Sequence, residues 1–424
     1  MAMEKIVSIG FILIVLLGCT SSQKIVQKNV CPVLDSELFE NHFTGFFVLD
    51  PEKRDTIFSH NSAKYFTPAS NTKIYTLFTS LHLLPDSIPS LRYNVYNDTL
   101  FVEGTGDPSF LHPYLKDSTA LNFLKEYDII SFHLNNIQEE RFGPGWAWGD
   151  YQWYYSAERS SFPVYGNVLT VYEKEGLQVS PALFKDKVIP IDYAIQREEN
   201  ENLFYFNPSR RDTVEIPLKL DSTLVRNLLE DALKKKVSIT QNPIKGKKSV
   251  LYSMPSDSIY VKMMMDSDNF LAEQLLILAS STLSDTLNTD KVRNFVLDSL
   301  LTDLRQPPRW VDGSGLSRYN LFTPQSMVHV LHLMYQHIPR QRLFSLFPAG
   351  GVSGTLENWY PGDPEPYIYA KTGSLGNNHC ISGYLLTKSG KTLIFSFMNN
   401  HFRIPSSEVK KRMQSIFETI RDTY

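Results

Sequence analysis

One short stretch constrains what this 424-residue chain can fold into more than any other, the sequence TPASNTK at residues 67–73. Behind it, apolar residues recur at the spacing of a buried helical face, at Ile74, Leu77, Phe78, Leu81 and Leu84. Pro85 ends the pattern. The spacing predicts a buried helix that opens at Ser70, with Lys73 one turn later on the same side.

Ser70 and Lys73 are a candidate nucleophile and base. A serine at the start of a helix has its hydroxyl near the positive end of the helix dipole, where a developing oxyanion is favoured. An amine one turn away can take the hydroxyl proton if burial or a neighbouring cation lowers its pKa. An N-capping serine followed by a solvated lysine would show the same spacing, which arises by chance in many chains. The spacing alone leaves both interpretations open.

The first residues indicate export. Lys5 precedes an apolar run at residues 6–17, which is too short to span a bilayer as a mature helix. The run ends in LLGC, a pattern that resembles a bacterial lipoprotein signal, with residues 1–18 removed and Cys19 lipidated. An ordinary secretory signal is the alternative, and either one exports the chain. We expect residues 19–33 to form a polar tether.

Composition and motif searches exclude several functional classes. The formal net charge of -3 shows no basic excess, so nucleic acid is not an expected partner. The ten histidines are scattered, and Gly104 and Gly106 lack the third glycine of a dinucleotide-binding loop, so we expect no metal and no cofactor. Besides Cys19, the chain has Cys31 and Cys380. They could form one disulfide in an oxidising compartment or remain two buried thiols.

The pattern along the chain predicts an α/β (α+β) fold in which one sheet is flanked by helices. Strand and turn signals predict a hairpin at residues 44–60 and late strands at residues 367–372, 381–386 and 393–398. An amphipathic helix ends the chain. Residues 34–90 and 251–424 would together form this discontinuous domain.

Residues 91–250 differ in character and predict an inserted β-rich domain. Short strand-like runs alternate with turn signals there. Five aromatic residues cluster in one segment, namely Trp146, Trp148, Trp153, Tyr154 and Tyr155. Such a cluster could line a glycan groove. We expect it instead to form the packed core of the insert, where large aromatic side chains are more often found.

Two further motifs follow in the order that a known enzyme class requires. SDN at residues 267–269 lies in a loop between two predicted helices, and KTG at residues 371–373 ends the first late strand. Alone, the first would be a capping turn and the second a strand end. Together with Ser70 and Lys73, they form the signature of penicillin-binding proteins and related β-lactamases.

Longer stretches make the resemblance more specific. PASNTK at residues 68–73, SDNFLAEQL at residues 267–275 and DGSGLSRYN at residues 312–320 resemble the D-alanyl-D-alanine carboxypeptidase/endopeptidase family of low-molecular-mass class C penicillin-binding proteins. GTGDP at residues 104–108 and GTL at residues 354–356 are similar to the same family. The resemblance covers most of residues 40–400, patchily in the insert. It implies the fold shared by serine β-lactamases and penicillin-binding transpeptidases.

The chemistry of the motif residues and the resemblance point to the same roles. Ser70 would attack a D-Ala carbonyl to give an acyl-enzyme. Lys73 would take its proton, while a cation at Lys371 helps to keep Lys73 neutral. Ser267 would relay a proton to the leaving amine. Asn269 is expected to hydrogen-bond both Lys73 and the substrate backbone.

The third motif is expected to bind substrate. Lys371 and Thr372 would hold the free carboxylate beside the scissile bond. Gly373 would let the strand approach the substrate without a side-chain conflict. The backbone N–H groups of Ser70 and Ser374 would form the oxyanion hole.

Two neighbouring features are expected to be structural. The loop at residues 312–315 has the composition of a turn that borders the site without a chemical role. His379 follows the third motif and is expected to pack or to lie at the surface rather than to act as a base.

The sequence therefore predicts an exported, membrane-tethered serine DD-peptidase that acts on peptidoglycan stem peptides and is acylated by β-lactams. The motifs do not separate removal of a terminal D-Ala from cleavage of a cross-link. A β-lactamase or esterase on the same scaffold is one alternative, although the class A deacylation motif Glu-x-x-x-Asn is missing between the second and third motifs. A non-catalytic wall-binding lipoprotein is another, although the complete set of motifs argues against it.

Overall fold

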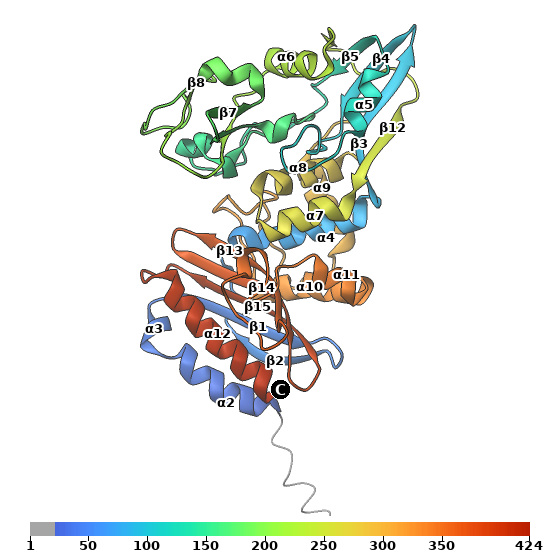
Figure 1. The fold of residues 1–424 in the computed structure, drawn as a ribbon. Coiled ribbons are helices and arrows are strands. Elements are labelled where there is room, and N and C mark those ends of the chain that lie inside the picture. The colour runs from blue at the N-terminus through green and yellow to red at the C-terminus, as the bar shows by residue number, and fades with distance from the viewer. Residues whose placement is uncertain (1–21) are drawn as a thin grey trace, which may run out of the picture.

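The computed structural model describes residues 22–424, so the predicted signal at residues 1–18 and Cys19 lie outside the described residues. The central sheet has five strands in the order β13-β14-β15-β1-β2, and every neighbouring pair is antiparallel. These strands are β1 (Phe43–Asp50), β2 (Asp55–His60), β13 (Ile368–Leu375), β14 (Asn378–Leu386) and β15 (Thr392–Asn400). The predicted hairpin and late strands are confirmed, and β1 joins the two parts of the chain by pairing with β15 (Figure 1).

Helices cover both faces of this sheet, because successive side chains of each strand point to opposite faces. On β15, Ile394 belongs to the core shared with α4 and α10, whereas Phe395 belongs to a second core formed with α2 and α12. The four helices are α2 (Ser22–Leu34), α4 (Lys73–Leu83), α10 (Pro324–His337) and α12 (Ser406–Thr423). In Figure 1, α2 and α12 lie side by side on one face of the sheet. The predicted antiparallel sheet flanked by helices is confirmed.

The segment predicted to be a tether is a helix instead. Within α2, the apolar residues Val26, Val30 and Leu34 are buried in the core shared with α12 and the sheet. Their spacing of four residues gives α2 one continuous apolar face. The prediction failed because polar residues between these three dominate the composition of a short segment. A one-turn helix, α3 (Glu37–Glu40), then leads to β1.

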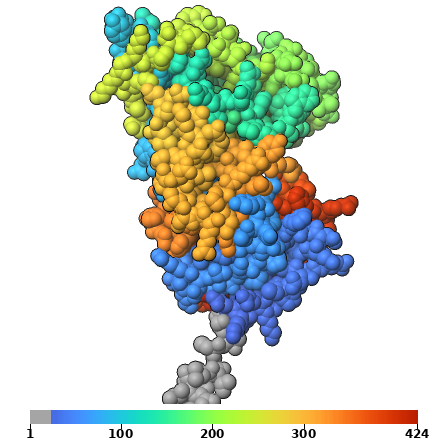
Figure 2. All heavy atoms as spheres, turned by 180° about the vertical axis from the view of Figure 1, so that it is seen from behind, coloured from blue at the N-terminus to red at the C-terminus, as the bar shows by residue number. Residues whose placement is uncertain are grey.

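A layer of helices separates the sheet from the insert (Figure 1). Besides α4, it contains α7 (Ser256–Met265), α8 (Asn269–Ser280), α9 (Thr289–Phe295) and α11 (Arg340–Ser345). All residues of α8 from Phe270 to Ser280 are buried. Figure 2 shows the stretch of chain that contains α8 and α9 in gold, between the insert and the N-terminal part of the chain, which is blue. An enclosed helix of this kind can contact the catalytic residues and the insert at the same time.

The insert is built on a second five-stranded sheet in the order β11-β5-β4-β3-β12. Its strands are β3 (Ser87–Tyr96), β4 (Thr99–Gly104), β5 (Ile129–His133), β11 (Ser238–Ile239) and β12 (Ser249–Pro255). Because β3 and β12 pair with each other, the chain leaves the helical layer and returns to it through neighbouring strands. The boundaries predicted at residues 91 and 250 fall inside these two strands.

Shorter elements complete the insert around one hydrophobic core. β10, β6 and β7 form a three-stranded sheet in that order, and β8 pairs with β9. The elements are α5 (Thr119–Lys125), β6 (Val168–Glu173), β7 (Leu177–Ser180), β8 (Val188–Ile189), β9 (Phe204–Tyr205), β10 (Val214–Pro217) and α6 (Ser222–Leu233).

The two cysteines within residues 22–424 do not pair, and only one of them is a buried thiol. Cys31 on α2 is exposed, Cys380 on β14 is buried, and both are free thiols. Burial raises the pKa of Cys380 to about 12. Over residues 22–424, none of the helices has both the length and the apolar character needed to cross a membrane.

Candidate active site

Ser70 and Lys73 meet at the start of α4. Residues Ala69–Thr72 form a single 3₁₀ turn, η1, which leads directly into the α-helix. The Nζ atom of Lys73 donates to the Oγ atom of Ser70 at 2.9 Å. Ser70 borders a cavity, whereas Lys73 is fully buried beneath it. This is the geometry of a hydroxyl nucleophile and its base.

Two further oxygen atoms hold the Lys73 amine. Its Nζ donates to the Oδ1 of Asn269 at 2.7 Å, a contact that the sequence predicted. It also donates to the backbone carbonyl of Ser314 at 2.7 Å. The loop at residues 312–315 was expected only to border the site, so this prediction was wrong in part. Every residue has a main-chain carbonyl, so the sequence does not show which carbonyl will accept a hydrogen bond from Lys73.

Burial lowers the pKa of Lys73 to about 8. Three nearby carboxylates oppose this shift, those of Asp268, Asp312 and Glu273. From the sequence, burial or a cation at Lys371 is expected to keep Lys73 neutral. In the structure, burial is the main cause, and it brings the amine close to its neutral state at moderately alkaline pH.

The loop that carries Ser314 is ordered by a buried carboxylate. Asp312 accepts hydrogen bonds from the backbone N–H of Ser317 at 2.7 Å and from the Asn320 amide at 2.7 Å. Glu273 on α8 accepts the N–H of Ser314 at 2.8 Å. Because these buried acceptors are satisfied by fixed donors, the loop holds the Ser314 carbonyl in place beside Lys73.

Lys371 enters the same pocket from β13. Its Nζ donates to the Oγ of Ser267 at 2.8 Å and to the carbonyl of Thr372 at 2.8 Å. Lys371 is fully buried, and its pKa lies well below that of a free lysine, first because of burial and then because of the charge of Lys73. The charge of Lys73 therefore acts directly on Lys371.

The second motif forms the turn between α7 and α8. Ser267 has a φ of 58°, which lies in the left-handed region. Asp268 caps α8 by accepting the N–H of Leu271 at 2.8 Å. The Nδ2 of Asn269 donates to the carbonyl of Tyr155 in the insert at 3.0 Å. One of the amide N–H groups predicted to face the substrate backbone is therefore used to hold the insert.

Gly373 is required by the close approach of β13 to the Ser70 turn. A Cβ atom at this position would lie 2.4 Å from the carbonyl oxygen of Pro68 and 2.9 Å from the backbone nitrogen of Ser70. From the sequence, this glycine is expected to let the strand approach the substrate. In the structure the crowding comes from the protein's own backbone, so Gly373 is what lets β13 lie against the Ser70 turn.

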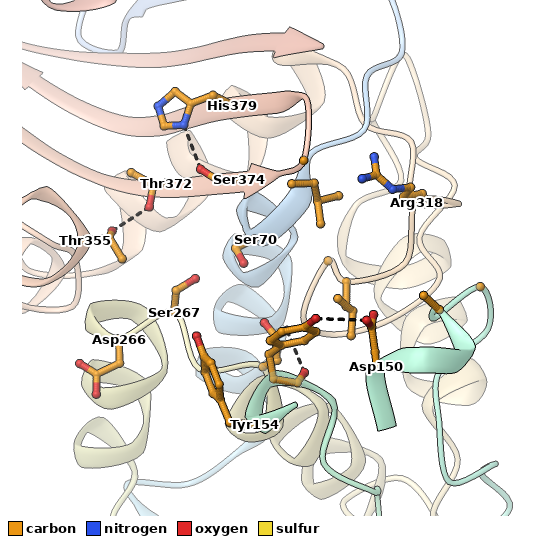
Figure 3. A pocket seen from close by; sticks show the side chains of 18 of the residues that line it. Ser70, Asp150, Tyr154, Asp266, Ser267, Arg318, Thr355, Thr372, Ser374 and His379 are labelled. Carbon is orange, nitrogen blue, oxygen red and sulfur yellow. Dashed lines mark hydrogen bonds between the residues drawn. The ribbon is translucent and has the colours of Figure 1, made fainter. Parts of the chain in front are cut away.

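Alternate residues of β13 face the cavity. Thr372 and Ser374 lie on this face, beside Ser70 (Figure 3). Thr372 donates from Oγ1 to the Oγ1 of Thr355 at 2.7 Å. The Oγ of Ser374 lies 3.0 Å from the Nδ1 of His379. Burial lowers the pKa of His379 to about 3, so its ring is neutral at neutral pH.

This order of motifs on this fold has a counterpart among known proteins. The model of the D-Ala-D-Ala carboxypeptidase 3 (S13) family matches residues 26–186 and 212–422. The chain belongs to this family. The resemblance noted in the sequence is therefore confirmed, and the protein is a serine-type D-Ala-D-Ala peptidase.

Individual relatives agree with the family match. The D-alanyl-D-alanine carboxypeptidase DacB of Haemophilus influenzae is 22% identical over 92% of each chain. The structure of penicillin binding protein 4 from the same organism has a TM-score of 0.73 at 20% identity and covers 93% of this chain and 98% of its own. A structure of that protein complexed with a β-lactam has a TM-score of 0.65 at 19% identity, with the same coverage. A predatory peptidoglycan endopeptidase from Bdellovibrio bacteriovorus has a TM-score of 0.53 at 15% identity, over 89% and 93% of the two chains.

The candidate catalytic cleft is the cavity that Ser70 borders, with a volume of about 680 Å³ and a lining from both parts of the chain. Ser70, Ser267 and Thr372 contribute from the helical layer and β13. Asp150 and Tyr154 contribute from the insert, opposite Thr372 in Figure 3. The insert therefore forms one wall of the cleft.

The aromatic cluster of the insert lies at this wall and at the surface. Trp148 keeps 78% of its surface exposed and Tyr154 keeps 62%. The Nε1 of Trp146 donates to the Oδ2 of Asp312 at 3.0 Å. The prediction that these residues form the packed core of the insert was wrong, because strand residues such as Leu169 and Phe204 form that core.

Buried polar contacts with α8 fix the insert in position. Gln274 donates from Nε2 to the carbonyls of Gly106 and Ser160, each at 2.9 Å, and accepts the N–H of Ser160 at 3.1 Å. The guanidinium of Arg159 lies 3.5 Å from the carboxylate of Glu273. Both ion-pair partners are buried, so the wall of the cleft is tied to the helix that also supports Lys73.

The cavity-lining residues that sequence reasoning missed include Thr355, Arg318 and Lys410. Thr355 and Arg318 lie in stretches that resemble the family, but nothing in those stretches indicated a role for these side chains. Lys410 lies on α12, where the sequence showed only an amphipathic helix. Within the described part of the chain, no group of three or more His, Cys, Asp or Glu side chains is placed to hold a metal ion.

Proposed function

We propose that the protein hydrolyses the peptide bond that follows a D-Ala residue in peptidoglycan stem peptides, through an acyl-enzyme at Ser70. The observation that carries this proposal is the 2.9 Å contact between Lys73 Nζ and Ser70 Oγ in a pocket that Lys371 shares. The name of the Haemophilus influenzae relative, a D-alanyl-D-alanine carboxypeptidase, supports the substrate class.

In acylation, neutral Lys73 takes the hydroxyl proton while the Oγ of Ser70 attacks the D-Ala carbonyl carbon. The backbone N–H groups of Ser70 and Ser374 would donate to the oxyanion that forms. The C–N bond then breaks, and the proton that Lys73 took would pass through the Ser267 hydroxyl to the leaving amine, which leaves Lys73 neutral again. Lys371, which donates to the Ser267 hydroxyl, would keep its own proton. Water hydrolyses the ester with Lys73 again as base, which restores Ser70 and releases the shortened peptide.

Lys371 and Thr372 would bind the carboxylate on the carbon next to the scissile nitrogen. A terminal D-Ala and the diamino acid of a cross-link both carry this group, so carboxypeptidase and endopeptidase reactions would use the same contact. A bound carboxylate raises the pKa of Lys371 and keeps it charged. That charge lowers the pKa of Lys73, so substrate binding would favour the neutral base.

A fluorescent penicillin tests the proposal. The wild type should form a covalent adduct and release D-Ala from a pentapeptide, whereas Ser70→Ala should do neither. Ser80→Ala is the matched control, since Ser80 is buried on the same helix and its hydroxyl donates to the Thr76 carbonyl at 2.9 Å. Labelling that persists in Ser70→Ala would contradict an acyl-enzyme at this residue.

Two rival functions predict different outcomes of the same experiments. A β-lactamase would hydrolyse the penicilloyl adduct rapidly, whereas a peptidase would lose it slowly. A non-catalytic wall-binding protein would bind sacculi equally well with Ser70→Ala and would release no D-Ala. Incubation with cross-linked muropeptides, followed by separation of the products, would show whether the cross-link is cut as well.

We also propose that the protein is exported and anchored by lipid at Cys19. Because α2 begins at Ser22 and packs on the folded body, the intervening chain could span only about 10 Å. The catalytic body would then lie close to the membrane surface. Cys19→Ser should lose incorporation of a labelled fatty acid and leave the membrane fraction. Cys31→Ser, which changes an exposed cysteine of α2, should keep both, and labelling of Cys19→Ser would contradict the proposal.

A further inference from the structure

The insert contains a second cavity next to the catalytic cleft, with a volume of about 340 Å³. The aromatic segment at residues 145–155 forms the wall between the two cavities. Ala147 lines both of them, Tyr154 lines the cleft, and Trp146 and Trp148 line the second cavity. Apart from Trp153, the members of the aromatic cluster therefore line two adjoining cavities, and the catalytic steps above use only the first.

The second cavity combines flat apolar surfaces with hydrogen-bonding groups. Four aromatic side chains line it, those of Phe142, Trp146, Trp148 and Tyr151. Its polar lining consists of Arg141, Glu158, Arg197, Glu199, Asn200 and Lys219. Trp148 is 78% exposed at the edge of this surface. An exposed indole at the edge of a concave, partly apolar site offers a flat surface on which a ligand can stack.

Part of the polar lining is already fixed. The buried carboxylate of Glu158 accepts the N–H of Leu220 at 3.0 Å and lies 3.8 Å from the Arg141 guanidinium. Arg197 is buried, donates to a backbone carbonyl at 2.6 Å, and lies 5.0 Å from the centre of the Tyr151 ring. Groups held in this way do not have to be ordered by a ligand, which lowers the cost of binding.

We propose that the second cavity binds a sugar of the glycan strand from which the stem peptide hangs, an inference that rests on the proposed function. A pyranose has an apolar C–H face, which can stack on an aromatic ring, and an edge of hydroxyl and acetamido groups, which donate and accept hydrogen bonds. The lining offers both. It mixes three cationic side chains with two carboxylates, which suits a neutral polar ligand better than an anion.

The position of the second cavity next to the cleft also favours a sugar of the same substrate as its ligand. Four extended residues span about 13 Å, so a stem peptide with its D-Ala end at Ser70 carries its sugar only a short distance away. The second cavity adjoins the cleft at Ala147 and has aromatic side chains in its lining, so it lies where the sugar could bind. Peptide and sugar of one substrate would then occupy adjoining cavities.

Paired substrates test the inference. The wild type should show a higher kcat/KM for a pentapeptide attached to its disaccharide than for the free pentapeptide, by up to about tenfold for one stacked ring. Trp148→Ala should lower this ratio to about one. Trp153→Ala is the matched control, because this tryptophan belongs to the same segment and to neither cavity lining, and it should keep the wild-type ratio. A ratio of one in the wild type, or an equal loss in both variants, would overturn the inference.

A binding measurement separates this inference from the proposed function. In the Ser70→Ala protein, saturation-transfer NMR should detect the N-acetylglucosamine–N-acetylmuramic acid disaccharide whose lactyl carboxyl group is capped as a simple amide, so that the probe is neutral, and Trp148→Ala should remove the signal. Binding should change little with ionic strength, whereas a strong loss in salt would indicate an anion site and overturn the assignment. D-Ala release without disaccharide binding would overturn the inference alone. Disaccharide binding without D-Ala release would overturn the proposed function alone.

Discussion

The two sides of the catalytic cleft each hold one fully buried lysine, in opposite electrostatic surroundings. Lys73 lies near three carboxylates, so its pKa falls only to about 8 despite complete burial. Lys371 is equally buried, and the charge acting on its pKa is the repulsive one of Lys73, which adds to the effect of burial. Identical side chains at equal depth therefore serve different purposes because of the charges around them.

The difference shows which side is incomplete without substrate. Lys73 has its counter-charges and its acceptors in the protein, as a base that must be held in place requires. Among residues 22–424, no carboxylate acts on the pKa of Lys371, and a buried amine in that position gains most from a ligand that carries a carboxylate. In the proposed mechanism, the β13 side of the cleft, with Lys371, would therefore select the substrate, and the α4 side, with Ser70 and Lys73, would carry out the reaction.

The largest effect is expected from removal of the base. Lys73→Ala should lower the rate of acylation by penicillin about 10³-fold, because proton transfer from Ser70 is lost. The loss should be the same for substrates with and without a free carboxylate. Stopped-flow acylation with Lys388→Ala, an exposed lysine, as control would measure it. A loss confined to carboxylate-bearing substrates would reverse the roles assigned to the two sides.

A substitution that moves β13 away from the Ser70 turn should have the next largest effect on acylation. In Gly373→Ala the added methyl group meets the Pro68 carbonyl, so β13 must move away from the Ser70 turn, at a cost of about 1–3 kcal/mol in stability. The rate of acylation by penicillin should fall as well, because Lys371 moves with β13. Thermal unfolding and penicillin labelling would test this against Gly376→Ala, whose nearest neighbour is the flexible end of Arg318 at 3.5 Å. A fully active Gly373→Ala protein would show that the close approach is not needed.

Lys371→Met tests the selective role of the β13 side. The variant should lose about 10- to 100-fold in kcat/KM for a peptide with a free terminal carboxylate, which is the range for a charged hydrogen bond. The corresponding peptide amide should change much less. Parallel kinetics on the two peptides give the answer. An equal loss on both would assign Lys371 to the chemistry rather than to recognition.

Much of this arrangement could be predicted from local patterns. The helical spacing behind Ser70, the β1–β2 hairpin and the three late strands are short-range signals, and each lies close to its predicted position. The three motifs could be read because their residue types and order are specific. The same reasoning failed at α2, where Val26 and Val30 define a buried face among polar residues.

What could not be predicted depends on contacts between distant segments. The carbonyl of Ser314 and the carboxylate of Glu273 act on Lys73 only after the loop and α8 pack against α4. The exposure of Trp148 depends on where the insert places its segment, because a tryptophan-rich sequence is compatible with a core or a surface. A residue's type shows what it can do, and the packing of distant segments decides whether it does so.

The pH dependence of acylation tests the α4 side directly. Lys73 must be neutral to accept a proton, and its pKa is lowered to about 8. The rate constant should therefore rise with pH, by about tenfold per unit well below pH 8, and reach a plateau above it. Penicillin acylation measured at low substrate concentration reports this pKa for the free enzyme. A rate that is flat between pH 6 and 9 would mean that Lys73 is already neutral throughout.

The smallest effect is expected from removal of one counter-charge. Glu273→Gln keeps an acceptor for the Ser314 N–H but removes a charge that raises the pKa of Lys73. The midpoint of the pH–acylation profile should move to lower pH while the plateau stays high. Glu139→Gln is the control, because Glu139 is the other carboxylate that pairs with Arg159, at 3.3 Å. If both variants shift the midpoint equally, the shift comes from a displaced Arg159 and not from the lost charge near Lys73.

A shift in Glu273→Gln alone would show that the nearby carboxylates raise the pKa of Lys73. Lys371, on the β13 side of the cleft, has no such effect from a carboxylate among the described residues.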